Sequence, residues 1–102
     1  MLSDKTAEKK EIDPDALMRE YKQTGSLEAR NKLVMHYIYI AQGMAVKMSS
    51  TYHKYATTEE MVNQCVIALI NSLERFDPDK GVKFSTYAFT KIRGAIIDYV
   101  RK

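Results

Sequence analysis

Residues 83–97 interleave cations with an aromatic ring. Lys83, Lys91 and Arg93 supply positive charge, and Tyr87 lies among them with a threonine directly before it. Cations neutralise phosphates and release their counterions, while an aromatic ring accepts an unpaired base by stacking. This segment therefore predicts contact with a nucleic-acid strand. In the alternative interpretation, Tyr87 packs on a neighbouring helix or loop and the cations form a solvated face.

Catalysis and metal binding have little support in the sequence. His36 and His53 have no acid or cysteine at metal-ligand spacing, so neither a metal nor another cofactor is expected. Cys65 is the only cysteine, which excludes an internal disulfide, and we expect an inert buried thiol. Asp77 and Asp79 form an acid pair, but no nucleophile or glycine-rich phosphate loop accompanies them. The chain is therefore not expected to be an enzyme.

Length and composition favour one small helical domain. The chain has 102 residues with a formal charge of +3, and a chain of this size buries about two-thirds of its unfolded surface. Two prolines and four glycines favour helices over a β-sandwich. No run of about 18 apolar residues is present, and the N-terminus lacks the apolar core of a secretory signal. We therefore expect a cytoplasmic protein without membrane contact.

Capping and turn signals divide the chain into helices. Residues 1–12 lack apolar anchors and are expected to form a flexible lead-in to a domain over residues 13–102. Asp13 is a good N-cap and Pro14 suits the first helical position. Gly25 can end this first helix in a left-handed conformation.

The second helix is expected to be long and deeply packed. Ser26 caps it, and apolar residues recur at three- and four-residue steps from Leu33 to Met48. Further apolar residues widen this stripe, so we expect burial on much of the helix circumference. Residues 49–56 are expected to form a loop or a broken helix end.

Two more helices follow. Thr57 and Glu60 form a capping box that opens the third helix. The turn chemistry of residues 77–81 ends it, and a fourth helix starts near residues 85–86. The expected fold is a small all-α bundle of three to four helices.

These last two helices differ in charge. Residues 57–77 hold four acids and one base, whereas residues 83–102 hold five bases and one acid. Successive residues of a helix point 100° apart, so the last helix has a side that faces the core and an opposite side. The opposite side carries polar and small residues. It also carries Tyr87 and Ile97, which do not suit a solvated face. Gly94 costs the helix about 1 kcal/mol relative to alanine. It either lets a partner approach closely or marks a close helix crossing.

The segment ERFDPDKGVKFSTYA at residues 74–88, followed by IRGAIID at residues 92–98, closely resembles region two of bacterial RNA polymerase sigma factors. The resemblance is best to the flagellar and motility-type alternative sigma factors and covers residues 15–102. It implies the three- to four-helix sigma region two bundle and a role in transcription initiation. Because complete sigma factors continue into further domains, an isolated or truncated domain is expected.

The resemblance implies that the helix over residues 59–75 docks on core RNA polymerase, at the clamp helices of its largest subunit. The positions expected to face the polymerase are Glu60, Asn63, Gln64, Val66 and Ile70. The family commonly has a more acidic start to this helix and glycines at the positions of Cys65 and Ala68.

The resemblance also implies that the turn and the last helix capture the non-template single strand of the promoter minus-ten element. The residues expected to contact DNA are Phe76, Asp77, Lys80, Lys83, Phe84, Thr86, Tyr87, Phe89, Thr90, Lys91, Arg93, Gly94 and Ile97. Tyr87 would stack on a flipped base and Asp77 would meet the base edge. Lys80 and Lys83 would meet phosphates, and Phe84 is expected to be half in the core.

Two departures favour an alternative sigma factor. Housekeeping sigma factors carry a tryptophan pair where this chain has Thr90 and Lys91, and a glutamine and threonine where it has Gly94 and Ile97. Other functions stay open at this point. One is a protein–protein interaction module, such as the target of an anti-sigma factor or a degenerate sigma-like domain without DNA binding. Another is a basic helical protein that binds duplex DNA.

Overall fold

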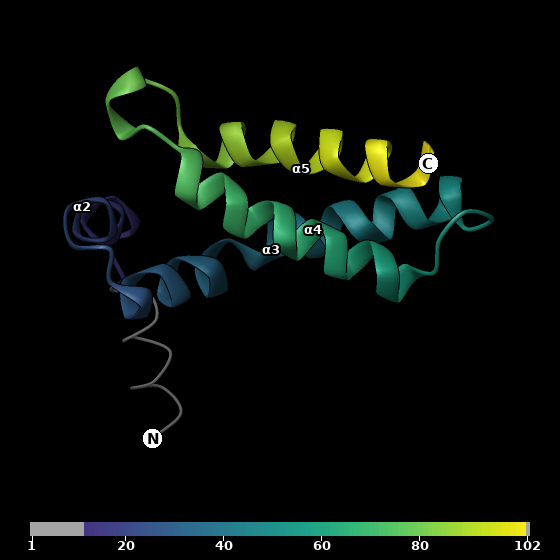
Figure 1. Cartoon of the computed structure of the whole chain (residues 1–102), viewed down its shortest axis with the longest axis horizontal. Coiled ribbons are helices and arrows are strands. Elements are labelled where there is room, and N and C mark those ends of the chain that lie inside the picture. Colours follow the sequence, from purple (N-terminus) through teal and green to yellow (C-terminus); the bar gives the residue numbers. More distant parts are fainter. Residues whose placement is uncertain (1–11, 102) are drawn as a thin grey trace. The chain divides into compact units, whose positions relative to one another are not determined.

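The computed structural model describes residues 12–101. It contains α2 (Pro14–Thr24), α3 (Leu27–Tyr52), α4 (Thr58–Arg75), the short 3-10 helix η1 (Pro78–Lys80) and α5 (Phe84–Arg101) (Figure 1). The described residues contain no strand, so the predicted all-α fold is confirmed. The predicted lead-in lies outside the described residues except for Ile12. None of the helices described is long and apolar enough to cross a membrane.

The chain divides into two compact units, and the division falls inside α3, between Leu33 and Val34. The first unit includes α2 and the first turns of α3. The second unit includes the rest of α3, with η1, α4 and α5. The candidate site residues all belong to the second unit.

The helix boundaries of the first unit follow local hydrogen bonds. Asp13 Oδ1 accepts the N–H groups of Asp15 and Ala16 at 3.1 and 3.2 Å. Gly25 ends α2 with φ 70°, a conformation that favours glycine. Ser26 Oγ accepts the N–H three residues further on at 3.2 Å. The boundary signals predicted at these positions are confirmed.

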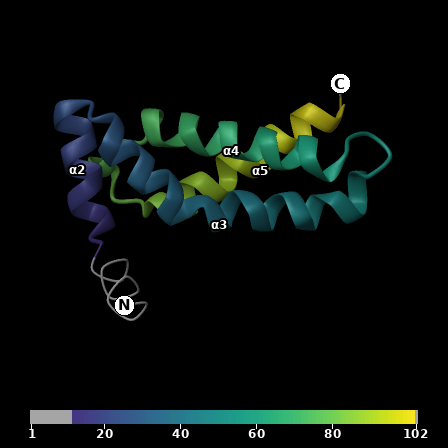
Figure 2. The ribbon, with the colours of Figure 1, turned by 90° about the horizontal axis from the view of Figure 1, so that it is seen from below.

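The second unit is built on α4 and α5, which run antiparallel and pack against each other (Figures 1 and 2). The second half of α3 lies beside them, because Tyr37 of α3 contacts Phe84 of α5 with ring centres 4.7 Å apart. All three helices bury apolar side chains: Ile40, Ala41, Met44, Ala45 and Met48 of α3, Met61, Cys65, Ala68, Leu69 and Leu73 of α4, and Ala88, Ile92, Ile96 and Val100 of α5. Burial raises the pKa of the Cys65 thiol to about 11, so it stays protonated and unreactive at neutral pH.

Helix α3 is longer than the sequence indicated. It continues through residues 49–51 and ends at Tyr52, where a loop or broken end was expected. Short hydroxyl side chains can bond to carbonyls of the preceding turn, and Ser50 Oγ donates to the Lys47 carbonyl at 3.0 Å. The hydroxyl of Ser49 instead forms a hydrogen bond with the hydroxyl of Thr58 at the start of α4. The connection to α4 is shorter than predicted.

One face of α3 is also more exposed than predicted. Met35, Tyr39 and Val46 are 67 %, 60 % and 67 % exposed. Their spacing places them on one side of the helix, away from the buried residues. The expected burial on much of the helix circumference does not extend to this side, because apolar periodicity does not tell how many neighbours a helix has.

The start of α4 is fixed by the predicted capping box. The Thr57 N–H donates to Glu60 Oε1 at 2.8 Å, and the Glu60 N–H donates to Thr57 Oγ1 at 3.1 Å. Tyr99 near the end of α5 donates its hydroxyl to Glu60 Oε2 at 3.1 Å. Hydrogen bonds from the Thr57 backbone, the Thr57 side chain and Tyr99, in that order, lower the pKa of Glu60. This carboxylate therefore joins the start of α4 to the end of α5.

Glu60→Gln keeps an oxygen for the capping box but removes the ionisable group. The pKa of Glu60 in the folded chain lies below its ordinary value of 4.5. The carboxylate's contribution to stability is therefore fully present above that value and is lost as the pH falls through the lowered pKa. Between about pH 6 and about pH 3, the wild type should lose more thermal stability than Glu60→Gln. Circular dichroism melts at stepped pH measure this, and parallel curves for the two proteins would contradict it.

Candidate functional site

The turn between α4 and α5 positions the first candidate residues. Asp77 Oδ1 accepts the N–H of Asp79 at 2.9 Å, and Gly81 adopts φ 75°, the left-handed conformation that favours glycine. Lys80 and Lys83 are exposed on either side of Gly81. One oxygen of Asp77 therefore serves the turn itself, and the turn presents two cations at the start of α5.

Four aromatic rings form a continuous cluster beside this turn. Phe84 lies 4.7 Å from Tyr37 and 5.2 Å from Phe76, and Phe76 lies 5.4 Å from Tyr87, measured between ring centres. Such pairs contribute about 0.5–1.5 kcal/mol each beyond area burial. Phe76 and Phe84 are only 8 % and 6 % exposed. Both were expected to contact DNA, but their burial gives them a supporting position beneath Tyr87, and Phe84 is more deeply buried than expected.

Tyr87 itself is half-buried. Its ring packs on Phe76, and Lys91 Nζ lies 5.5 Å from the ring centre. The ring therefore packs on neighbouring side chains, as one interpretation of the sequence expected. It also keeps some exposed surface, which the interpretation as a nucleic-acid contact requires. Arg93 is exposed further along α5.

The candidate residues of α5 lie on two sides of the helix. Tyr87 and Lys91 line a groove of about 250 Å³ between α5 and α4. Phe89 lines a separate groove of about 340 Å³ between α5 and α3. Residues two apart in a helix point about 200° apart. Tyr87 and Phe89, both expected to contact DNA, therefore line different grooves.

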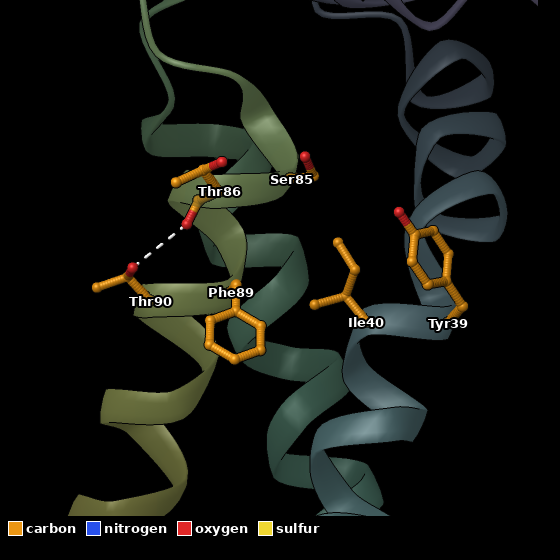
Figure 3. A pocket seen from close by; sticks show the side chains of 6 residues that line it. All are labelled: Tyr39, Ile40, Ser85, Thr86, Phe89 and Thr90. Atoms are coloured by element: carbon orange, nitrogen blue, oxygen red, sulfur yellow. Dashed lines mark hydrogen bonds between the residues drawn. The ribbon is translucent and has the colours of Figure 1, made fainter.

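Figure 3 shows the groove between α3 and α5. Its lining residues are Tyr39 and Ile40 of α3 and Ser85, Thr86, Phe89 and Thr90 of α5. Ile40 and Phe89 lie on opposite sides of it, and Thr90 Oγ1 donates to the Thr86 carbonyl at 3.3 Å. Phe89 is 46 % exposed. The groove thus combines exposed aromatic rings with hydroxyl groups.

Tyr39 was not among the candidate site residues predicted from the sequence. Its spacing identifies it only as one residue of an apolar helix. No neighbouring residue in the sequence indicates that α5 lies beside it. An exposed aromatic residue can be recognised as part of a site only when the partner helix is placed.

The structure separates the two interpretations of Gly94. A Cβ atom built at this exposed position meets no atom within 4 Å. No close helix crossing therefore requires the glycine. Ile97, one turn further along α5, is half-buried.

The outer side of α4 carries the second set of candidate residues. Asn63 is exposed and Gln64, Val66 and Ile70 are half-buried. Glu60 is exposed, but its carboxylate already accepts the hydrogen bonds of the helix start. Sequence analysis did not select Ile67, which is 50 % exposed on the same side as Asn63 and Ile70. This side of α4 is a mixed apolar and amide surface.

Among residues 12–101, no three His, Cys, Asp or Glu side chains lie close enough together to hold a metal ion. The grooves instead bring together aromatic rings, hydroxyl groups and cations. Such groups bind by stacking, hydrogen bonding and charge.

Aromatic and cationic side chains line the grooves beside α5, and a mixed apolar and amide surface lies on the antiparallel α4. Residues 33–102 match the family model of sigma-70 region 2, and the chain belongs to this family. The match begins within one residue of the boundary between the two compact units. The family therefore corresponds to the second unit.

Individual relatives agree with this assignment. The chain is 30 % identical over 90 residues to the RNA polymerase sigma-D factor of Bacillus subtilis, covering 88 % of this chain and 35 % of that protein. It is 27 % identical over 85 residues to the RNA polymerase sigma factor FliA of Pseudomonas aeruginosa, covering 83 % of this chain and 34 % of that protein. The predicted resemblance to region two of flagellar-type sigma factors is confirmed. The chain spans about a third of the length of these relatives.

Gly94→Ala should stabilise the chain by about 1 kcal/mol, because alanine has the higher helix propensity and its Cβ enters open space. Gly43 of α3 is a matched control, since a Cβ there also meets nothing within 4 Å. Urea denaturation of both variants measures the change in unfolding free energy. A loss of stability in Gly94→Ala, with a gain in Gly43→Ala, would show that Gly94 has an intramolecular role.

Proposed function

We propose that this chain is the part of an alternative sigma factor that binds core RNA polymerase and captures the non-template strand of the promoter minus-ten element. It acts in the cytoplasm as a binding domain, over residues 13–102, and catalyses no reaction. Family membership supports the proposal, as do relatives whose names identify them as RNA polymerase sigma factors.

The half-exposed ring of Tyr87 is the observation that carries strand capture. A base that leaves a duplex loses its stacking energy. Stacking on an aromatic side chain restores about 1–3 kcal/mol of binding free energy per base. Tyr87 is held by Phe76 at 5.4 Å, so the ring is positioned before a strand arrives. Lys80 and Lys83 of the neighbouring turn are exposed and can neutralise the flanking phosphates.

The groove between α3 and α5 extends this surface. Tyr39 and Phe89 offer further exposed aromatic surface, and Thr86 and Thr90 lie beside it. Further bases of the same strand would bind here, on the other side of α5 from Tyr87. Gly94 lacks a side chain where the strand backbone would approach α5.

Tyr87→Ala should weaken binding to a minus-ten single strand by about 1–3 kcal/mol, because the stacking surface is lost. Tyr55→Ala is the matched control, since Tyr55 is 70 % exposed in the loop between α3 and α4. Fluorescence anisotropy with a labelled strand and a scrambled strand measures both variants, and circular dichroism checks that helicity is unchanged. Equal losses for the two strands, or no loss in Tyr87→Ala, would count against base capture.

The outer side of α4 is the proposed polymerase-docking surface. Val66, Ile67 and Ile70 expose apolar surface there, and Asn63 and Gln64 add hydrogen-bonding groups. A helix face of this kind suits a groove or a pair of helices on a protein partner. The clamp helices of the largest polymerase subunit are the partner that the family resemblance implies.

Ile67→Glu should weaken binding to core RNA polymerase by more than about 1 kcal/mol, because a charge would replace a central apolar contact. Val46→Glu on α3 is the control, since Val46 is an equally apolar exposed residue outside the proposed surface. Pull-down with core polymerase and surface plasmon resonance compare the two variants. Equal binding by Ile67→Glu and the wild type would remove this side of α4 from the interface. Polymerase binding by the wild type without strand binding would favour a protein–protein module, such as an anti-sigma target.

A further inference from the structure

The groove between α4 and α5 contains residues of α4 that the proposed function leaves without a role. It is lined by Ala68, Asn71, Ser72 and Arg75 of α4 and by Tyr87, Lys91 and Ala95 of α5. Positions 68, 71, 72 and 75 share one side of α4, to which Gln64 also belongs, whereas Asn63, Val66 and Ile70 lie on the neighbouring side. Helix α4 therefore presents a second surface toward the DNA-binding helix.

The polar groups of this groove are mainly hydrogen-bond donors. Arg75 and Lys91 are cations, and the Asn71 amide and the Tyr87 hydroxyl can also donate. Ser72 is buried and already donates its hydroxyl to the Ala68 carbonyl at 2.7 Å. No carboxylate lines the groove. The groove therefore matches an anion.

The two cations have no acidic partner within the described part of the chain. Neither Arg75 nor Lys91 lies within ion-pair distance of a carboxylate there. Lys91 instead places its ammonium group 5.5 Å from the centre of the Tyr87 ring. Two cations that share one groove repel each other, and a bound anion relieves that repulsion while accepting hydrogen bonds from both.

The neighbourhood of Tyr87 decides which anion fits. Tyr87 lines the groove and also carries the proposed base stacking. A base held on that ring brings its own phosphodiester with it, within reach of groups in the same groove. Arginine in particular presents a planar fork of N–H groups that matches two phosphate oxygens.

We propose that Arg75 and Lys91 together bind one phosphodiester of the strand whose base stacks on Tyr87, with Asn71 as a further donor. The proposal rests on the proposed strand capture and adds α4 to the nucleic-acid surface. The same helix then binds polymerase on one side and the strand backbone on another.

The test uses the 102-residue chain and a set of minus-ten single strands, each with one phosphodiester replaced by a neutral methylphosphonate. At one linkage the replacement should weaken binding of the wild type, and it should weaken binding of Arg75→Gln less, because only Lys91 then remains to contact that phosphate. Arg75→Gln should also make the plot of log K against log salt shallower by about 0.7, the change expected for one phosphate contact on a single strand. Arg101→Gln is the matched control, because Arg101 lies about 15 Å along α5 from Lys91 and should change neither result.

The outcomes separate this inference from the proposed function. If Tyr87→Ala weakens strand binding while Arg75→Gln keeps wild-type affinity and salt slope, the phosphate contact is wrong and strand capture stands. If Tyr87→Ala has no effect, strand capture itself fails and this inference fails with it. Inorganic phosphate is titrated as a separate probe, followed by NMR shifts of the Arg75 side chain. NMR shifts with free phosphate, but no linkage at which Arg75→Gln reduces the effect of the methylphosphonate, would assign the groove to a free anion and overturn the proposal.

Discussion

The packing of α4 against α5 is the constraint on which both proposed binding surfaces depend. The helices are joined at one end by Tyr99, which donates to Glu60 at 3.1 Å, and at the other by the contact of Phe76 with Phe84. Between these ends the two helices bury apolar side chains against each other. The side of α4 proposed to dock on polymerase and the side of α5 proposed to bind the strand are thereby held at a fixed distance and angle. The proposed function would benefit from such rigidity, because positioning by flexible segments would lose entropy on each binding event.

The features of the fold that depend on local chemistry could be predicted from the sequence. The N-caps at Asp13 and Thr57 and the glycine ends at Gly25 and Gly81 involve residues a few positions apart, so their hydrogen bonds can be read from spacing. The end of α3 and the exposure of one of its faces could not. They depend on which helices pack beside α3, and an apolar pattern records only that a side chain is compatible with burial.

The candidate site divides in the same way. Tyr87 could be selected because an aromatic residue among cations stands out along one helix. The sequence could not tell that Phe89 faces a different helix from Tyr87, since this depends on where α3 and α4 lie. Tyr39 and Arg75 were not predicted as site residues for the same reason. Each becomes a candidate only because a residue of α5 lies across a groove from it. The burial of Phe84 was underestimated because its ring contacts Tyr37 and Phe76, which are distant in the sequence.

Several features of the proposed surfaces make the chain less stable than it could be. Gly94 lowers helix propensity without any internal contact that needs it, and Ile67 leaves an apolar side chain half exposed. Arg75 and Lys91 share a groove that lacks a counter-charge. Each feature is unfavourable or neutral for folding, and each becomes favourable once a strand backbone, an apolar partner or a phosphate is present.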